Sequence, residues 1–208
     1  MKKKTVKIIF IRHGESEKNV LNMSSHSLDM HPLTEKGRKE VRKIVEKFSD
    51  KIDIILVSPV LRARETAEIL NKKIGAEIKL ENAILEYNYG EWNDIPKREL
   101  LKSNKNYQKY KKLTSLEDKF NFRLGKNGES RKEIVERIGK FIKKLVKNNL
   151  EKTILIVSHG GINAAICKAV SNCSMDEYFA QEKIGHNVIQ YFVVDENCKI
   201  VDYKSRKY

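Results

Sequence analysis

The sequence predicts an α/β fold in which helices cover both faces of a mostly parallel sheet, forming a three-layer α/β/α sandwich. Continuous runs of Val, Ile and Leu, such as those at 6–11 and 153–158, are typical of strands buried on both faces. Amphipathic helical segments separate these runs. No repeat and no low-complexity linker interrupts the 208 residues, so we expect a single domain over residues 1–208.

Each predicted element has its own pattern. Apolar runs indicate the strands, and apolar side chains spaced three and four residues apart indicate the helices. In the first long helix, Val41, Ile44 and Phe48 share one face and Thr34 is the expected N-cap. In chain order we expect a strand at 6–11, a helix at 34–48, a strand at 52–58, a helix from Pro59 to about Asn71, a strand at 76–80, a helix at roughly 129–147, a strand at 153–158, a helix at 160–170, and strands at 187–194 and 199–203.

Residues 91–128 differ from the rest of the chain. They are rich in Lys, Asn and Tyr and show no sustained strand pattern, so we expect a small, mainly helical insertion of one or two short helices and loops. Two interpretations stay open for the lysines and tyrosines between Lys105 and Lys112. They either favour an acidic substrate or form a solvated helix face.

Composition bounds the class of protein. Hydrophobic residues make up 40% and charged residues 34% of the chain, which suits a globular domain. No apolar run is long enough to cross a bilayer, and the short apolar stretch after the basic N-terminus does not suit a signal peptide. Cys167, Cys173 and Cys198 lack CxxC spacing, which is typical of free thiols. We therefore expect a soluble, cytoplasmic protein that has no membrane partner.

The formal net charge of +14 would attract polyanions. However, the lysines are spread along the chain and fall mostly on the polar faces of predicted helices, as in "KGRKEVRKIVEKF". No nucleic-acid-binding motif accompanies them. We therefore favour solvated helix faces over a specific nucleic-acid site. The sequence says nothing about the oligomeric state.

Three of the buried strands end in polar residues. Arg12 and His13 follow the first strand, Arg62 lies in the helical turn after the second, and His159 follows the strand at 153–158. Each feature alone would suit a surface pair, a helix start or a tight turn. In a parallel sheet the carboxyl ends of the strands meet at one edge. We therefore expect two histidines and two arginines to converge there.

Phosphoryl transfer through a phosphohistidine needs this set of side chains. A neutral imidazole is a competent nucleophile near neutral pH. Guanidinium forks match the charged oxygens of a phosphoryl group, and a second imidazole can stabilise the group during transfer. The backbone N–H groups at the helix start after His159 can add further donors.

Other phosphate chemistries lack their motifs. The chain contains no GxxxxGK[ST] loop, no Cys followed six residues later by Arg, and no HExxH or paired-Asp cluster. Histidine is the remaining reactive group. We therefore expect no metal ion and no organic cofactor.

The sequence resembles the histidine phosphatase superfamily, in its phosphoglycerate mutase-like branch. The matching motifs, in the expected order, are "RHGESEKN" (12–19), "LTEKGRKE" (33–40), "SPVLRARETA" (58–67), "LEYNYGEW" (85–92), "GES" (128–130) and "VSHGG" (157–161). They span nearly the whole chain. The combination is specific for fold and phosphohistidine chemistry and much less specific for the substrate.

The resemblance implies roles for individual residues. His13 corresponds to the nucleophile that becomes phosphorylated, and Glu86 corresponds to the family's proton donor, with His159 as the third catalytic residue. A carboxylic acid beside a poor leaving group would assist its departure. The other implied positions are phosphate contacts at Arg12, Arg62, Asn19 and Gly160, and substrate-side contacts at Ser16 and Ser25.

The resemblance implies a phosphatase that hydrolyses small phosphate monoesters. The segment between Gly90 and Glu129 is shorter than in the cofactor-dependent mutases, so we expect the phosphohistidine to be open to water. The alternatives are a cofactor-dependent phosphoglycerate mutase and a catalytically weak interaction protein on the same fold. All five residues of the implied pocket and proton donor are present, which disfavours the interaction protein.

Overall fold

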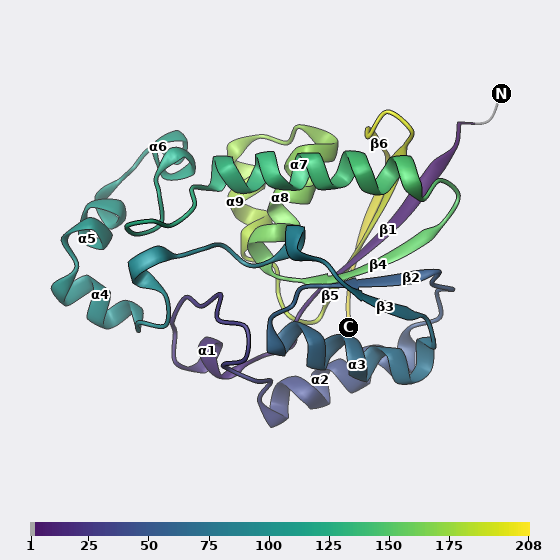
Figure 1. Ribbon diagram of the computed structural model, residues 1–208, viewed down its shortest axis with the longest axis horizontal. Coiled ribbons are helices and arrows are strands. Elements are labelled where there is room, and N and C mark those ends of the chain that lie inside the picture. Colours follow the sequence, from purple (N-terminus) through teal and green to yellow (C-terminus); the bar gives the residue numbers. More distant parts are fainter. Residues whose placement is uncertain (1–2) are drawn as a thin grey trace.

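A six-stranded sheet runs through the part of the chain that the computed structural model describes, residues 3–208 (Figure 1). Its spatial order is β3-β2-β4-β1-β5-β6. The first four of these pair in parallel, whereas β5 is antiparallel to both of its neighbours. The strands are β1 (Thr5–Arg12), β2 (Ile54–Val57), β3 (Glu77–Leu80), β4 (Thr153–Ser158), β5 (Val188–Asp195) and β6 (Ile200–Lys207).

Helices cover both faces of this sheet, which confirms the predicted layers (Figure 1). The α-helices are α1 (Glu17–Val20), α2 (Glu35–Lys47), α3 (Leu61–Ile74), α4 (Lys97–Ser103), α5 (Lys105–Lys112), α6 (Leu116–Asn121), α7 (Arg131–Asn148), α8 (Gly160–Ser171) and α9 (Met175–Glu182). Two short 3-10 turns, η1 (Asn82–Ile84) and η2 (Gly90–Trp92), lie between β3 and α4. Helices α2 and α3 lie on one face, and α7, α8 and α9 on the other.

Strand β1 shows how the sheet divides the core. Ile8 and Phe10 belong to a cluster that α7 and α8 complete, whereas Ile9 and Ile11 belong to a second cluster with α2 and α3. Because successive side chains of a strand point to opposite faces, a continuous apolar run fills both layers. The sequence pattern at residues 6–11 therefore reports a central strand.

Most predicted elements are confirmed, with shifted ends. Thr34 caps α2 as expected, since its hydroxyl accepts a hydrogen bond from the backbone N–H of Gly37 at 3.0 Å. Helix α3 begins at Leu61 and not at Pro59, because Val60 has an extended backbone and acts as the N-cap. The second strand is limited to Ile54–Val57, and the last extends to Lys207.

The prediction of one or two helices in the insertion was wrong, because residues 91–128 contain three: α4, α5 and α6. Asn104 ends α4 and at once caps α5, accepting from the N–H of Tyr107. Ser115 caps α6. These polar capping residues divide residues 91–128, which look irregular in the sequence, into separate short helices. Helix α9 was not predicted, although Ser174 and Glu177 form a capping box at its start.

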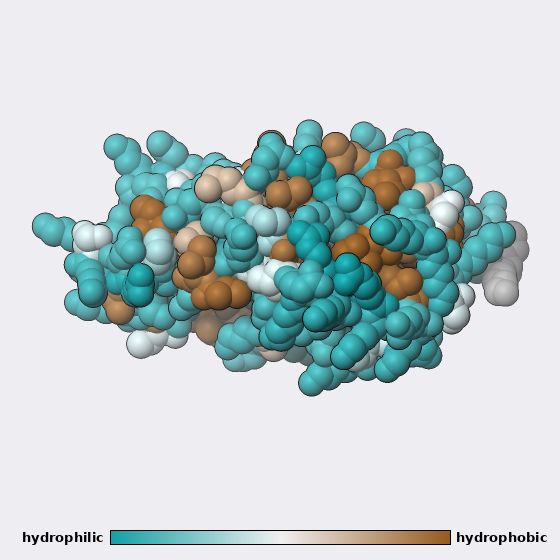
Figure 2. All heavy atoms as spheres, turned by 90° about the horizontal axis from the view of Figure 1, so that it is seen from below, coloured by the Kyte–Doolittle hydropathy of each residue, from teal (hydrophilic) through white to brown (hydrophobic). Residues whose placement is uncertain are grey.

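The insertion stands at the end of the molecule toward which the parallel strands run (Figure 1). It lies beside α1 and its following loop: the N–H of Asp94 donates to the carbonyl of Ser24 at 2.8 Å, and that of Lys97 to Asn22 at 3.1 Å. One face of the molecule, seen in Figure 2, is mostly hydrophilic with small separate hydrophobic groups. Within residues 3–208, no helix is long and apolar enough to cross a membrane.

Candidate active site

His13 lies at the carboxyl end of the central strand β1. Its backbone N–H donates to the carbonyl of Ser158 at 2.9 Å, which continues the pairing of β1 with β4 by one residue. The side chain is 1% exposed. The residue is therefore held by the sheet itself, at the edge where the parallel strands end.

Hydrogen bonds fix the tautomer of the His13 ring. Nδ1 lies 2.7 Å from the carbonyl oxygen of Gly14, to which it must donate, and Nε2 accepts from Nε of Arg62 at 3.2 Å. Burial, followed by the charges of Arg62 and the neighbouring His159, holds the pKa of His13 well below its usual range. The ring is therefore neutral, with its lone pair on Nε2.

Arg62 is placed beside His13 by α3, the helix that follows β2. Its side chain is completely buried, and Nη2 donates to the carbonyl of Ser25 at 2.8 Å. Nη1 is buried and has no hydrogen-bond partner among residues 3–208. Burial lowers the pKa of Arg62, but the ordinary pKa of arginine is so high that the group remains a cation. The N–H groups of Nη1 are thus available to bind an anion.

His159 is the N-cap of α8, directly after β4. Its ring centroid is 5.2 Å from that of His13, and Nε2 pairs with the hydroxyl of Ser58 at 2.8 Å. Nδ1 is buried without a hydrogen-bond partner in the described chain and lies 3.7 Å from Oε2 of Glu86. Burial lowers the pKa of His159 well below its usual range. The predicted convergence of the two imidazoles is present.

Arg12 completes the set from the end of β1. Nη1 donates to the carbonyl of Ile184 at 2.6 Å, whereas Nε is buried without a partner in the part of the chain described. Gly160 lies against this side chain: a Cβ there would come within 3.7 Å of Cζ of Arg12 and within 2.6 Å of the Glu182 carbonyl oxygen. The contact with Arg12 would be an ordinary one, so it is the Glu182 carbonyl that requires glycine at the start of α8.

Glu86 reaches the same place from the segment between η1 and η2. This segment is tied to β4, because the hydroxyl of Ser158 donates to the carbonyl of Ile84 at 2.7 Å. Burial by itself raises the pKa of Glu86, but the charges of His159, Lys18 and Arg62 and the N–H of Tyr87 together lower it to about 2. With His159 neutral, Lys18 and Arg62 supply the positive charge that keeps this carboxylate ionised.

Two residues of the site were missed in the sequence. Lys18 of α1 is 7% exposed, and its Nζ lies 3.4 Å from Oε2 of Glu86. His186 packs its ring 5.4 Å from that of His13, and its Nδ1 donates to the His13 carbonyl at 2.6 Å. Lysine within "ESEKN" has the pattern of a solvent-exposed residue, and His186 lies before a strand at some distance in sequence. The sequence around Lys18 and His186 therefore gives no sign that either side chain is buried.

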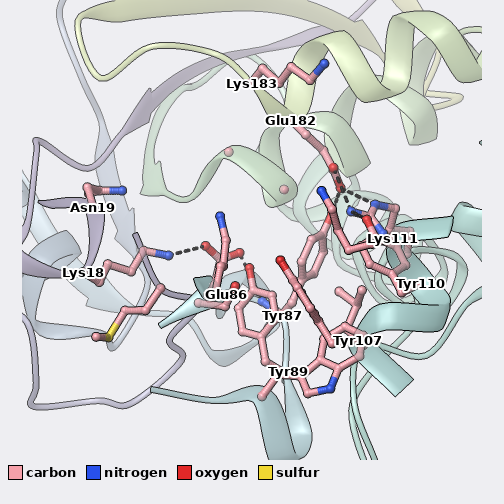
Figure 3. Close-up of a pocket in the computed structure, with 18 of the residues that line it drawn as sticks. Lys18, Asn19, Glu86, Tyr87, Tyr89, Tyr107, Tyr110, Lys111, Glu182 and Lys183 are labelled. Carbon is pink, nitrogen blue, oxygen red and sulfur yellow. Dashed lines mark hydrogen bonds and ion pairs between the residues drawn. The ribbon is translucent and has the colours of Figure 1, made fainter. Parts of the chain in front are cut away.

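A cavity of about 480 Å³ opens above these residues. Figure 3 shows Glu86 between Lys18 on one side and the tyrosines on the other, with Glu182 and Lys183 opposite. Glu182 is held by Nε of Arg131 at 2.8 Å and by the hydroxyl of Tyr87 at 2.6 Å. The lining residues from the site and the insertion include Arg12, Lys18, Asn19, Glu86, Tyr89, Trp92, Lys97, Tyr107, Tyr110, Lys111 and Gly160.

The structure places the remaining predicted residues differently. Asn19 lines the cavity, and its Oδ1 accepts from both the N–H and the hydroxyl of Ser16 at 3.0 and 2.8 Å. Ser16 and Ser25 are completely buried and, like His13, Arg62 and His159, are not among the lining residues. Ser16 fixes the start of α1, and the carbonyl of Ser25 positions Arg62. Their contact with a substrate stays a prediction.

The fold and this pocket together define a class of α/β protein suited to binding phosphate: a buried, neutral imidazole lies among guanidinium and imidazole nitrogens that have no hydrogen-bond partner within residues 3–208, with a carboxylate at the edge. Residues 8–202 match the model of the histidine phosphatase superfamily (branch 1), and the chain belongs to that family. In residues 3–208, no group of three His, Cys, Asp or Glu is placed to hold a metal ion.

Relatives in this family carry two kinds of name. Phosphoserine phosphatase 1 of Hydrogenobacter thermophilus is 28% identical over 74% of this chain and 71% of its own length. A 2,3-bisphosphoglycerate-dependent phosphoglycerate mutase of Bifidobacterium longum is 26% identical over 94% of this chain and 89% of its own. The crystal structure of Entamoeba histolytica phosphoserine phosphatase with 3-phosphoglyceric acid matches with a TM-score of 0.78 at 25% identity, covering 97% and 98% of the two chains.

Proposed function

We propose that this protein is a phosphatase that hydrolyses small phosphate monoesters through a phosphohistidine on His13. The observation that supports it best is the pairing of Nε2 of His13 with Nε of Arg62 at 3.2 Å, beside buried nitrogens of Arg12, Arg62 and His159 that have no hydrogen-bond partner within residues 3–208. Buried donors are rarely left unpaired in proteins, so a site that gathers several around one nucleophile is suited to an anion.

In the first step, Nε2 of His13 attacks phosphorus and the bond from phosphorus to the alcohol oxygen breaks. Glu86 gives its proton to that oxygen, and the alcohol leaves. The free enzyme holds Glu86 ionised, because cations surround it. A phosphate dianion bound between Arg12 and Arg62 offsets those cations and raises the pKa of the carboxyl group, so that Glu86 takes up the proton when substrate is present.

In the second step, water attacks phosphorus and the bond to Nε2 breaks, which releases inorganic phosphate. Glu86, now a carboxylate, takes the proton of that water. His159, which stands 5.2 Å from His13 by ring centroids, directs Nδ1 toward the transferred group and donates to its oxygens. Both steps use only groups of this chain and water, so EDTA should leave the rate unchanged. A strong loss of rate would contradict this metal-independent scheme.

A phosphoglycerate mutase is the second candidate. It is favoured by the burial of His13, which is 1% exposed and not open to water as the short segment between Gly90 and Glu129 led us to expect, because a sheltered phosphohistidine can return its phosphoryl group to an alcohol. The relatives named above include both activities. Incubation with a panel of phosphate monoesters, including phosphoserine and 3-phosphoglycerate, separates them. Release of inorganic phosphate supports the phosphatase, whereas the 2-isomer of phosphoglycerate as main product would replace it with the mutase.

A covalent intermediate provides the direct test. The enzyme is mixed briefly with substrate and quenched in alkali, since phosphohistidine is unstable in acid. Its intact mass should rise by one phosphoryl group, located on the peptide that contains His13. No such adduct in the wild type during rapid turnover would overturn the proposed mechanism.

A further inference from the structure

Lys18 is a buried lysine with few partners. It lies on the short helix α1, its side chain is 7% exposed, and it lines the cavity. Within residues 3–208 its only hydrogen-bond and ion-pair partner is Oε2 of Glu86, at a long 3.4 Å. An ammonium group has three N–H donors, so two remain unused. Burying an incompletely paired charge is costly unless a ligand pairs with it.

The proposed catalytic cycle removes even that partner. Burial lowers the pKa of Lys18 to about 7, and the charge of Glu86 opposes this shift, so the ammonium form depends on a neighbouring anion. With Lys18 protonated, the positive charges of Arg12, Arg62 and Lys18 face the single negative charge of Glu86, and a phosphate dianion would balance the remainder. When Glu86 is protonated to act as acid, however, one positive charge is left over. Arg12 and Arg62 flank the phosphoryl position beside His13, so the unbalanced charge is that of Lys18.

The position of Lys18 indicates which part of a substrate it meets. Nζ of Lys18 and Nδ1 of His159 both approach Oε2 of Glu86, at 3.4 and 3.7 Å (Figure 3 shows the lysine contact). Lys18 and Glu86 line the cavity, whereas His13 and His159 are not among the lining residues. Lys18 therefore meets a ligand from the cavity side of Glu86, where we place the leaving alcohol.

Resting on the proposed phosphatase function, we propose that Lys18 is a substrate-binding residue that recognises a carboxylate on the leaving-group side of the phosphate monoester. The ammonium exchanges Glu86 for the substrate carboxylate, and the protonated Glu86 then serves the departing oxygen. The substrates would be phosphorylated hydroxy acids or amino acids. A single ammonium matches one carboxylate charge better than it matches a second phosphate dianion.

The rim of the cavity supports an acidic substrate. Lys97, Lys111 and Lys183 also line it, and none of them takes part in an ion pair found within residues 3–208. The carboxylates that the cavity does hold, Glu86 and Glu182, are already occupied by Lys18 and Arg131. The lysines at the rim therefore attract an anionic substrate, and the buried ammonium of Lys18 can pair with its charge inside the cavity.

The test compares two primary phosphate esters, 3-phosphoglycerate and glycerol 3-phosphate. They differ at one position, where 3-phosphoglycerate has a carboxylate and glycerol 3-phosphate has a hydroxymethyl group. Wild-type kcat/KM should favour the acid, and Lys18→Met should lower that preference about 10- to 100-fold, as expected for a charge-assisted hydrogen bond. Lys18→Arg should retain part of it. Lys102→Met, at an exposed lysine of α4 away from the cavity lining, is the matched control and should leave the preference unchanged.

An equal loss on both esters in Lys18→Met would show that the lysine acts only through Glu86, and would overturn the proposal. No preference of the wild type for the acid would do the same. In either case, continued turnover of p-nitrophenyl phosphate that depends on His13 would leave the phosphatase function standing. Calorimetry on His13→Ala, with and without Lys18→Met, provides a second measurement: the acid should bind more tightly than glycerol 3-phosphate only when Lys18 is present.

Discussion

Two regions of the molecule meet at the cavity and are built in opposite ways. The floor, formed by His13, Arg62 and His159 at the ends of β1 and β4 and the start of α3, is completely or almost completely buried. The cover, residues 91–128, contains three short helices held together by packed aromatic rings, with Trp92 and Tyr107 edge to face at 5.1 Å between centroids. Its lysines, including Lys97 and Lys111, are exposed at the rim.

This difference assigns different tasks to the two regions. The floor has one arrangement, because strand pairing and buried hydrogen bonds fix each side chain, and it is suited to a reaction whose geometry does not change between substrates. The cover presents long, exposed side chains that adjust to a leaving group. Changes in the floor should abolish activity on every ester, and changes in the cover should alter the order of preference.

The largest expected effect is that of His13→Ala. Removing the proposed nucleophile should lower kcat on p-nitrophenyl phosphate by roughly 10⁴- to 10⁶-fold, by analogy with other covalent catalysts. Phosphate release is measured on purified protein whose circular dichroism matches wild type. Retained activity at a substantial fraction of wild type would reject His13 as the nucleophile and, with it, the functional division between floor and cover.

Glu86→Gln should have the next largest effect, and only where a proton is needed. For esters of poor leaving groups, such as sugar phosphates, kcat/KM should fall about 10²- to 10⁴-fold, the usual contribution of a general acid. For p-nitrophenyl phosphate, whose phenolate leaves without a proton, the loss should be much smaller. Equal losses on both substrates would remove the acid role and leave Glu86 as a structural partner of Lys18.

The sequence predicted the floor better than the cover. Parallel strands leave the sheet at one edge, so Arg12, His13 and His159 could be placed together from the ends of apolar runs alone. Lys18 could not be placed, because nothing in a short polar helix indicates burial. Its helix lies where the cover packs beside the loop after α1, as in the hydrogen bond from the N–H of Asp94 to the carbonyl of Ser24 at 2.8 Å. Such a contact joins two irregular segments that lie far apart in the chain. It leaves no periodic pattern in the sequence from which it could be predicted.

Acid should destabilise the floor, because its imidazoles are buried in the neutral form. Burial, with the charge of Arg12, lowers the pKa of His186 from 6.5 to about 4. Between these two values the unfolded chain binds a proton that the native protein excludes, so the free energy of unfolding falls as pH falls from 7 to 4. For this residue the loss is roughly 3 kcal/mol.

His186→Asn isolates that contribution, since the amide can still donate to the His13 carbonyl but does not titrate. Urea unfolding at pH 7 and pH 4 should show a smaller acid-induced loss in the variant than in the wild type, by about 3 kcal/mol at most. His13 and His159 titrate in both proteins and cancel in the difference. The same loss in both proteins would show that the His186 imidazole is readily protonated in the folded state.

The smallest expected effect is in the cover, at Lys111. This lysine is exposed and has no carboxylate partner within residues 3–208, so its influence on an anionic substrate is mainly long-range. Lys111→Met should raise KM for 3-phosphoglycerate by about two- to fivefold at low ionic strength, the range of an exposed charge pair, and leave kcat unchanged. The difference should disappear near 1 M salt, where the screening length is about 3 Å.

Lys102→Met is the control for a lysine of the same cover outside the cavity. A fall in kcat on p-nitrophenyl phosphate in Lys111→Met would mean that the cover shapes the floor, and the two regions would then have to be treated as one site.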